Sequence, residues 1–166
     1  MNKNYIIDAY NLGFKIPAIS DWIKSGETEK AIQLIINYVT KALIRKANKI
    51  IIVFDGKSGN PGNDSRQGKV QILFSKKPES ADDIIRRHMR SLNNASEWIV
   101  VTSDSEIRWT AEDMGAQVIS SENFIVSQLQ TGHKNKTRIN QEKYNPEDID
   151  MDYWLNKFNE SGDETG

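Results

Sequence analysis

The sequence contains no cysteine, which excludes disulfide bonds, thiolate metal sites and a cysteine nucleophile. It also lacks an apolar run near the roughly 20 residues of a membrane span. Its N-terminus has no basic segment, apolar stretch and cleavage site of the secretory type. An excess of one charge is missing too, because the net charge is -1. We therefore expect a cytoplasmic protein without a membrane partner, in which any binding site comes from local groups of residues.

Short, nearly continuous apolar runs are the main pattern that is present. Such runs predict strands that are buried on both faces, as in parallel sheets. Segments with helical spacing or helix-capping residues alternate with them and predict helices. This alternation predicts an α/β domain with three layers and a mainly parallel sheet. The predicted strands are Tyr5 to Ala9, Lys49 to Phe54, Val70 to Phe74, Trp98 to Val101 and Gln117 to Ile119, and the predicted helices are Glu27 to Ala47, Ser80 to about Leu92, Ser105 to Met114 and Ser120 or Ser121 to about Leu129.

Composition divides the chain into a body and a C-terminal extension. Residues 1–130 hold all five predicted strands, with loops predicted at 12–26 and 57–68 from their glycines and prolines. Residues 131–145 are polar and basic and indicate a linker, and 159–166 indicate a disordered tail. Residues 146–158 predict an amphipathic helix, which must bury its apolar face on the domain or on a partner. That face consists of Met151, Trp154, Leu155 and Phe158.

Aspartates follow three of the predicted strands, and two more begin a helix. Asp8, Asp55 and Asp104 come at or just after strand ends, and Asp82 and Asp83 open the second of the predicted helices. Right-handed crossovers place the carboxyl ends of parallel strands at one edge of the sheet, so these acids are expected to converge there. Each also has a structural alternative: a turn for Asp8 and Asp55, a helix cap for Asp83 and Asp104, and an interaction with the helix dipole for Asp82.

A cluster of carboxylates predicts a divalent cation. Like charges repel one another unless a cation compensates them, and oxygen ligands without cysteine favour Mg²⁺ or Mn²⁺. Two such ions about 4 Å apart would activate water and stabilise both oxygens of an in-line phosphoryl displacement. The glycine-rich stretch at 57–68 does not have the spacing of a phosphate-binding P-loop.

Four motifs in this order resemble a known family. IIDAYN, VFDG, SADD and VTSDSE are similar to the NYN domains of the PIN-like nuclease superfamily, and particularly to the YacP-like group of bacterial ribonucleases. The resemblance covers residues 4–130, and MDYWLNKF resembles the C-terminal end of that group. It implies a five-stranded sheet in the order 3-2-1-4-5. It also implies a metal-dependent endoribonuclease that hydrolyses RNA phosphodiester bonds, with a role in RNA decay.

The resemblance also implies roles for individual residues. Metal binding and catalysis would fall to Asp8, Asp82, Asp83 and Asp104. Supporting roles would fall to Asn11, which orients the first acid or the substrate, and to Ser103, Asp55 and Glu106. Related nucleases often carry an aspartate at the position of Glu106, whose side chain is longer.

Basic and aromatic side chains near these motifs are candidates for binding RNA, either single-stranded or messenger RNA. Cations would contact phosphates, and an aromatic ring would stack on a base. The alternative for the cations is that they form a solvated helix face. His88, in the same predicted helix, is interpreted as a surface residue. The candidates are Tyr10, Trp22, Lys76, Lys77, Arg86, Arg87 and Arg90.

Other classes of protein fit the sequence less well. A haloacid-dehalogenase phosphatase needs a second aspartate two residues after the first, where this chain has Tyr10. A receiver domain needs a lysine after its last strand, and here serines follow Ile119. A non-catalytic module that binds RNA or the ribosome through a vestigial metal site stays open as the alternative function.

Overall fold

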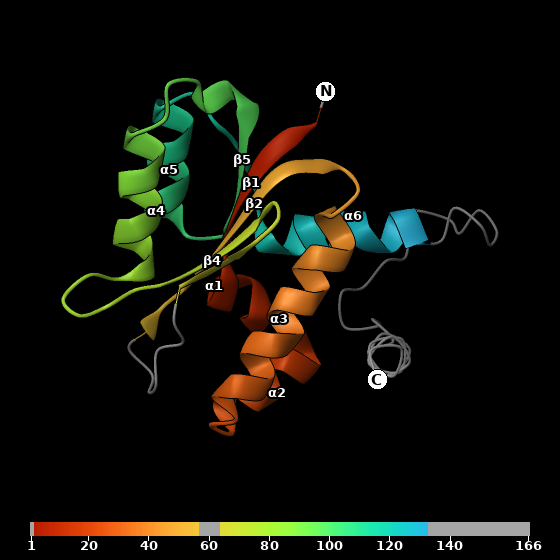
Figure 1. The fold of residues 1–166 in the computed structure, drawn as a ribbon. Helices are drawn as coiled ribbons and strands as arrows, with labels where there is room; N and C mark the ends of the chain where they lie inside the picture. The colour runs from red at the N-terminus through yellow and green to blue at the C-terminus, as the bar shows by residue number, and fades with distance from the viewer. Residues whose placement is uncertain (1, 57–63, 133–166) are drawn as a thin grey trace.

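The computed structural model describes residues 2–56 and 64–132. Strands and helices alternate along most of this part of the chain (Figure 1). The strands are β1 (Lys3–Asp8), β2 (Ala47–Phe54), β3 (Ser65–Gln67), β4 (Val70–Phe74), β5 (Trp98–Val101) and β6 (Gln117–Ile119). The helices are α1 (Ala9–Phe14), α2 (Pro17–Lys24), α3 (Thr28–Leu43), α4 (Ala81–Arg90), α5 (Ser105–Asp113) and α6 (Ser121–Gly132), with a 3₁₀ turn at Ala95–Glu97.

The strands form one sheet in the order β3-β4-β2-β1-β5-β6. All neighbouring pairs are parallel except β3 with β4. The mainly parallel α/β architecture is therefore confirmed, and the five expected strands follow one another as predicted. The count of five strands is wrong, because β3 adds a sixth strand at the edge.

Helices cover both faces of the sheet and make the three layers. Figure 1 shows α4 and α5 on one face and α1, α3 and α6 on the other. Side chains alternate along each strand, so Ile7 and Ile52 pack in the core under α1 and α3, whereas Ile6 and Ile51 pack under α4 and α5. Burying each large apolar side chain contributes about 1.5–3 kcal/mol, which fixes the central strands between the two cores.

The predicted loop at 12–26 is wrong, since α1 and α2 occupy most of it. Pro17 is at the start of α2, where its missing N–H costs nothing. Gly13 allows α1 to pack closely on α3, because a Cβ there would lie 2.7 Å from Cδ1 of Ile35. Strand β1 ends at Asp8, so the first strand is one residue shorter at its end than expected. The long helix is also shorter, because Ala47 already begins β2.

Two more predictions need correction. Residues 65–67, expected in a loop, form β3, whose three side chains are exposed and therefore gave no apolar signal. His88 is half-buried and not a surface residue. Its ring meets Trp98 edge-on at 5.3 Å, and its Nε2 atom is buried with no hydrogen-bond partner in the described part of the protein.

The C-terminal predictions lie outside the described residues. These are most of the linker at 131–145, the helix at 146–158 and the tail at 159–166. Among the residues that the structure describes, none of the helices combines the length and apolar character that crossing a bilayer requires.

Candidate active site

The predicted acids lie at the carboxyl edge of the sheet. Asp8 is the last residue of β1, and Asp55 follows β2 directly. Asp104 is the N-cap of α5, which follows β5, and Asp82 is in the first turn of α4. Asp8 is buried, with 7% of its surface exposed, although a carboxylate at a strand end normally reaches water. The sheet edge therefore holds a buried acid at its centre.

The charges of other acids act on the carboxylate of Asp8. Burial, the main cause, and the negative charges of Asp82, Asp104 and Asp55 raise the pKa of Asp8 to about 7. A hydrogen bond that Thr102 Oγ1 donates to Oδ2 over 2.9 Å acts in the opposite direction. The structure thus places three of the other predicted acids within electrostatic reach of Asp8.

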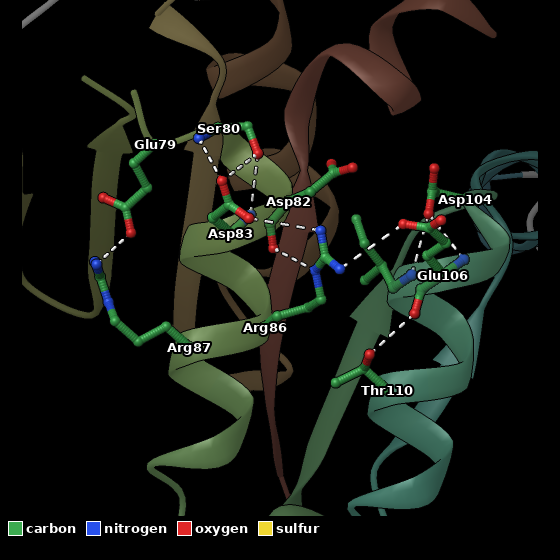
Figure 2. Close-up of polar contacts among 10 residues, drawn as sticks. Glu79, Ser80, Asp82, Asp83, Arg86, Arg87, Asp104, Glu106 and Thr110 are labelled. Carbon is green, nitrogen blue, oxygen red and sulfur yellow. Dashed lines mark hydrogen bonds and ion pairs between the residues drawn. The ribbon is translucent and has the colours of Figure 1, made fainter. Parts of the chain in front are cut away.

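Asp82 belongs to the same group. Its pKa is raised by burial and by the charge of Asp104, and it is lowered by the charge of Arg86. Figure 2 shows its carboxylate extending from α4 toward the side where Asp104 lies. The Arg86 guanidinium lies between α4 and α5, with its nitrogens 3.6 Å from Asp83 Oδ1 and 3.7 Å from Glu106 Oε2 (Figure 2). Arg86 therefore links the two helices that carry the acids.

Asp83 and Asp104 also cap their helices. The Asp83 carboxylate accepts hydrogen bonds from the backbone N–H of Ser80 over 2.9 Å and from its hydroxyl over 3.0 Å, and completes a capping box (Figure 2). Asp104 Oδ1 accepts from the backbone N–H groups of Glu106 and Ile107 over 2.9 and 3.1 Å. The structural alternatives foreseen for these two acids are thus present, and both cap bonds of Asp104 use one oxygen of its carboxylate.

The supporting residues form a polar network beside Asp8. Asn11 Oδ1 accepts hydrogen bonds from the backbone N–H of Ser103 over 2.9 Å and from the Ser121 hydroxyl over 2.7 Å. Thr102 Oγ1, which donates to Asp8, accepts from the backbone N–H of Asp104 over 3.1 Å. The hydrogen bond from the Ser103 N–H joins two of the predicted supporting residues, Asn11 and Ser103. Asp55 is on the other side of β1 along the sheet, and its Oδ1 accepts from the Ser75 hydroxyl over 3.2 Å.

Reasoning from the sequence missed three members of this network. Thr102 is 1% exposed and Ser121 is fully buried, and spacing alone marks them only as parts of a motif or a cap. Glu122 accepts a hydrogen bond from the Ser103 hydroxyl. The sequence could have indicated Glu122, because it follows the end of β6 closely, as the other acids follow the ends of their strands.

The candidate RNA-binding cations differ in their exposure and in their partners. Lys76, Lys77 and Arg90 are exposed. Arg86 faces carboxylates, and Arg87 forms an ion pair with Glu79.

The two candidate aromatic residues are partly buried and pack against the core. The Tyr10 ring meets Phe54 edge-on at 5.4 Å. The Trp22 ring has the Lys30 ammonium over its face at 3.7 Å. Base stacking by either ring stays a prediction.

The donor chemistry fits a magnesium or manganese ion. In residues 2–56 and 64–132, no three histidine, cysteine, aspartate or glutamate side chains come close enough to hold an ion as they stand. Mg²⁺, however, commonly takes one or two protein carboxylates and completes its shell with water and phosphate oxygens. The Asp8 carboxylate at the end of β1 is an oxygen donor of the kind that such an ion takes.

The fold and the acids at its sheet edge define a domain related to the PIN-like nucleases. Comparison of the sequence with protein families agrees, because the model of the YacP-like NYN domain matches residues 5–161. The chain belongs to the YacP-like NYN domain family.

Relatives of this chain include a protein of Bacillus subtilis. The chain is similar to the uncharacterized protein YacP of Bacillus subtilis (strain 168), with 30% identity over 114 residues. That match covers 67% of this chain and 66% of YacP, so it spans just under two thirds of the relative's length. Crystal structures of Rae1 (YacP) from Bacillus subtilis show the same fold. The structure of a Rae1 mutant gives a TM-score of 0.62 at 26% identity, covering 80% of this chain and 78% of that one. A second structure of Rae1 (YacP) gives a TM-score of 0.65 at 21% identity, covering 96% of this chain and 83% of that one.

Proposed function

We propose that this protein is an endoribonuclease that hydrolyses RNA phosphodiester bonds and depends on Mg²⁺ or Mn²⁺. The observation that supports the proposal most is the burial of Asp8 among the charges of Asp82, Asp104 and Asp55. Such an arrangement costs stability in the metal-free protein, and a divalent cation would offset that cost. Membership of a family related to nucleases makes phosphoryl chemistry the natural use of the site.

Asp8, Asp82 and Asp104 are the proposed metal ligands. Asp8 and Asp82 have raised pKa values, and Asp104 contributes to both shifts. Asp83 was predicted as a fourth ligand. Its carboxylate already forms the capping box and faces Arg86, so we leave it out of the proposed ligands. Asp55 and Glu106 would act as supporting acids.

The residues around Asp8 would orient the site. When bound, the metal ion would supply an activated water and stabilise charge on the phosphate oxygens, leaving a 5′-phosphate and a 3′-hydroxyl. Thr102 holds Oδ2 of Asp8 and, through its second hydrogen bond, the start of α5. Asn11 keeps the Ser103 backbone next to β1. These contacts would keep the Asp8 and Asp104 carboxylates in position before RNA binds.

RNA phosphates would meet the exposed cations of the β4–α4 connection and of α4. Lys76, Lys77 and Arg90 are exposed there, and Arg87 is exposed with an ion pair to Glu79. We assign Arg86 a different main role from phosphate binding, because its guanidinium faces Asp83 and Glu106.

A panel of labelled substrates tests the proposal. Single- and double-stranded RNA and DNA are incubated with the protein in Mg²⁺, in Mn²⁺ or in EDTA. We expect cleavage of RNA within the strand, only when a divalent metal is present. Cleavage that persists in EDTA would contradict the metal dependence. RNA binding without cleavage under any condition would favour the alternative, a non-catalytic module that binds RNA or the ribosome.

A further inference from the structure

Glu122, in the first turn of α6, is an acid without a role in the site so far. Its two carboxylate oxygens contact different partners. Oε2 accepts a hydrogen bond from the Ser103 hydroxyl over 2.5 Å, and Oε1 lies 3.0 Å from Lys15 Nζ at the end of α1. The hydrogen bond from Ser103 is the main cause that lowers the pKa of Glu122, so the residue is a carboxylate at neutral pH.

Ser103 connects Glu122 to the acids of the sheet edge. The Ser103 hydroxyl also accepts a hydrogen bond from the backbone N–H of Ser121 over 3.0 Å. The Ser103 backbone N–H donates to Asn11. Ser103 lies between Thr102 and Asp104 in the chain, and Thr102 donates a hydrogen bond to Asp8. A single serine thus ties the start of α6 to the segment between the acids at positions 8 and 104.

We infer that Glu122 is a positioning residue for the metal-binding edge, acting through Ser103. By accepting a hydrogen bond from the Ser103 hydroxyl, it fixes the orientation in which that oxygen accepts the hydrogen bond from the Ser121 N–H. It thereby keeps the 102–104 segment against α1 and α6. Loss of this acceptor would let the segment shift and would displace the carboxylates of Asp8 and Asp104. This inference rests on the proposed function, since its main readout is RNA cleavage.

A simpler account is that Glu122 only stabilises α6 through the helix dipole, as acids in a first turn commonly do. Glu29 provides a matched control, because it is an exposed acid in the first turn of α3. Lys15→Met removes the ion pair and leaves the Ser103 hydrogen bond in place. Glu122→Gln keeps an oxygen acceptor for Ser103 and removes the charge, whereas Glu122→Ala removes both.

The experiment measures kcat and KM for RNA at saturating Mg²⁺ for these four variants and the wild type. We expect Glu122→Ala to lose about 10-fold or more in kcat, the lower end of the cost of removing a residue that orients metal ligands, with little change in KM. Glu122→Gln should retain most of kcat, and Lys15→Met and Glu29→Ala should match the wild type. A wild-type kcat in Glu122→Ala overturns the inference. An equal loss in Glu122→Gln does so as well, because the charge and not the acceptor would then matter.

A second measurement separates this inference from the proposed function. Amide hydrogen exchange at Ser103 and Ser121 is followed without metal or RNA. We expect both amides to exchange faster in Glu122→Ala than in Glu122→Gln or Glu29→Ala, because their hydrogen bonds depend on the placement of Ser103. If the wild type does not cleave RNA, the proposed function fails while this comparison still tests the positioning role. Equal exchange in all three variants overturns it.

Discussion

At the scale of single residues, the ionised form of Asp8 is unfavourable for folding. A folded-state pKa of about 7, well above the value of 3.8 for a free aspartate, means that the folded protein binds more protons than the unfolded chain between these pH values. The contribution of Asp8 to the free energy of unfolding is therefore largest below about pH 4. This contribution is lost as the pH rises through about 7. Ionised Asp8 therefore lowers the stability of the metal-free protein, as the proposed role in metal binding requires.

Asp8→Asn should remove this cost. The amide is neutral, and its oxygen still accepts the hydrogen bond from Thr102. In EDTA at about pH 8 we expect the variant to be as stable as the wild type or more stable, by about 0.5–2 kcal/mol, while it loses RNA cleavage. The advantage should shrink as the pH is lowered toward about 4, where the wild-type carboxyl is protonated. Urea unfolding of both proteins across this pH range measures it, and a variant that is less stable than the wild type at the alkaline end would show that the carboxylate is structural.

The residues of the site were partly predictable. The placement of Asp8, Asp82 and Asp104 at one edge of the sheet was predictable, because each stands at a strand end or helix start and parallel topology brings such positions together. Thr102 and Glu122 were not, because their importance comes from contacts with Asp8 and Ser103 that spacing does not encode. The ion pair of Arg86 with Glu106 was not predictable either, because the partner that a long side chain reaches depends on the packing of α4 against α5.

At the scale of elements, α5 depends on Asp104 as its N-cap. Asp104→Ala removes two hydrogen bonds to the backbone and should lower the free energy of unfolding by about 0.5–2 kcal/mol, whereas Asp104→Asn caps nearly as well and should cost little. Both variants should lose RNA cleavage if Asp104 also holds the metal. Thermal melts in EDTA and cleavage assays in Mg²⁺ measure the two effects. Full activity in Asp104→Asn would show that Asp104 acts only as the N-cap of α5 and does not bind the metal.

The exposed face of α4 is the element proposed to meet RNA. Reversing charge at Arg87 and Arg90 avoids Arg86, which contacts the acids of the site. We expect the double variant Arg87→Glu/Arg90→Glu to bind RNA more weakly. Its affinity should also depend less steeply on salt, with the slope reduced by roughly one unit for each phosphate that is no longer neutralised. Arg45→Glu, on the opposite side of the sheet after α3, is the control. Equal affinities and slopes in the wild type and the double variant would leave α4 as an ordinary solvated face.

Elements were predictable in proportion to their length and apolar content. The WIVV run predicts β5 with correct ends because both of its faces are buried. Ser80 and Asp83 predict the start of α4, because a capping box is encoded within four residues. Helix α1 has six residues, which is too short to show helical periodicity, and β3 has three exposed ones. Both depend on packing and pairing against the rest of the molecule.

At the scale of the whole molecule, the sheet separates two apolar cores. The strand order followed from the resemblance and is confirmed by the pairing of β1 with both β2 and β5. This arrangement puts the site at the point where the chain connections diverge, between β1 and β5. The added edge strand β3 lies away from that point, so missing it did not affect the location of the acids.

Residues 146–158 lie outside the described part of the chain, and the prediction that they bury an apolar face stays to be tested. Truncation after Asn145 should lower the melting temperature if this face packs on the domain, because each large side chain contributes about 1.5–3 kcal/mol when buried. Truncation after Asn159 removes only the expected tail and is the matched control. Equal melting temperatures for the wild type and both truncated proteins would exclude packing on the domain and favour docking on a partner such as the ribosome.

The central claim is that acids at the sheet edge use a divalent cation to hydrolyse RNA. The most direct measurement is the end chemistry of the products from single-stranded RNA, for the wild type and for Asp8→Asn, in Mg²⁺ and in EDTA. We expect the wild type in Mg²⁺ to leave 5′-phosphate and 3′-hydroxyl ends, with water as the nucleophile, and the other three reactions to leave the RNA intact. Products ending in a 2′,3′-cyclic phosphate, or equal cleavage by Asp8→Asn, would contradict the claim.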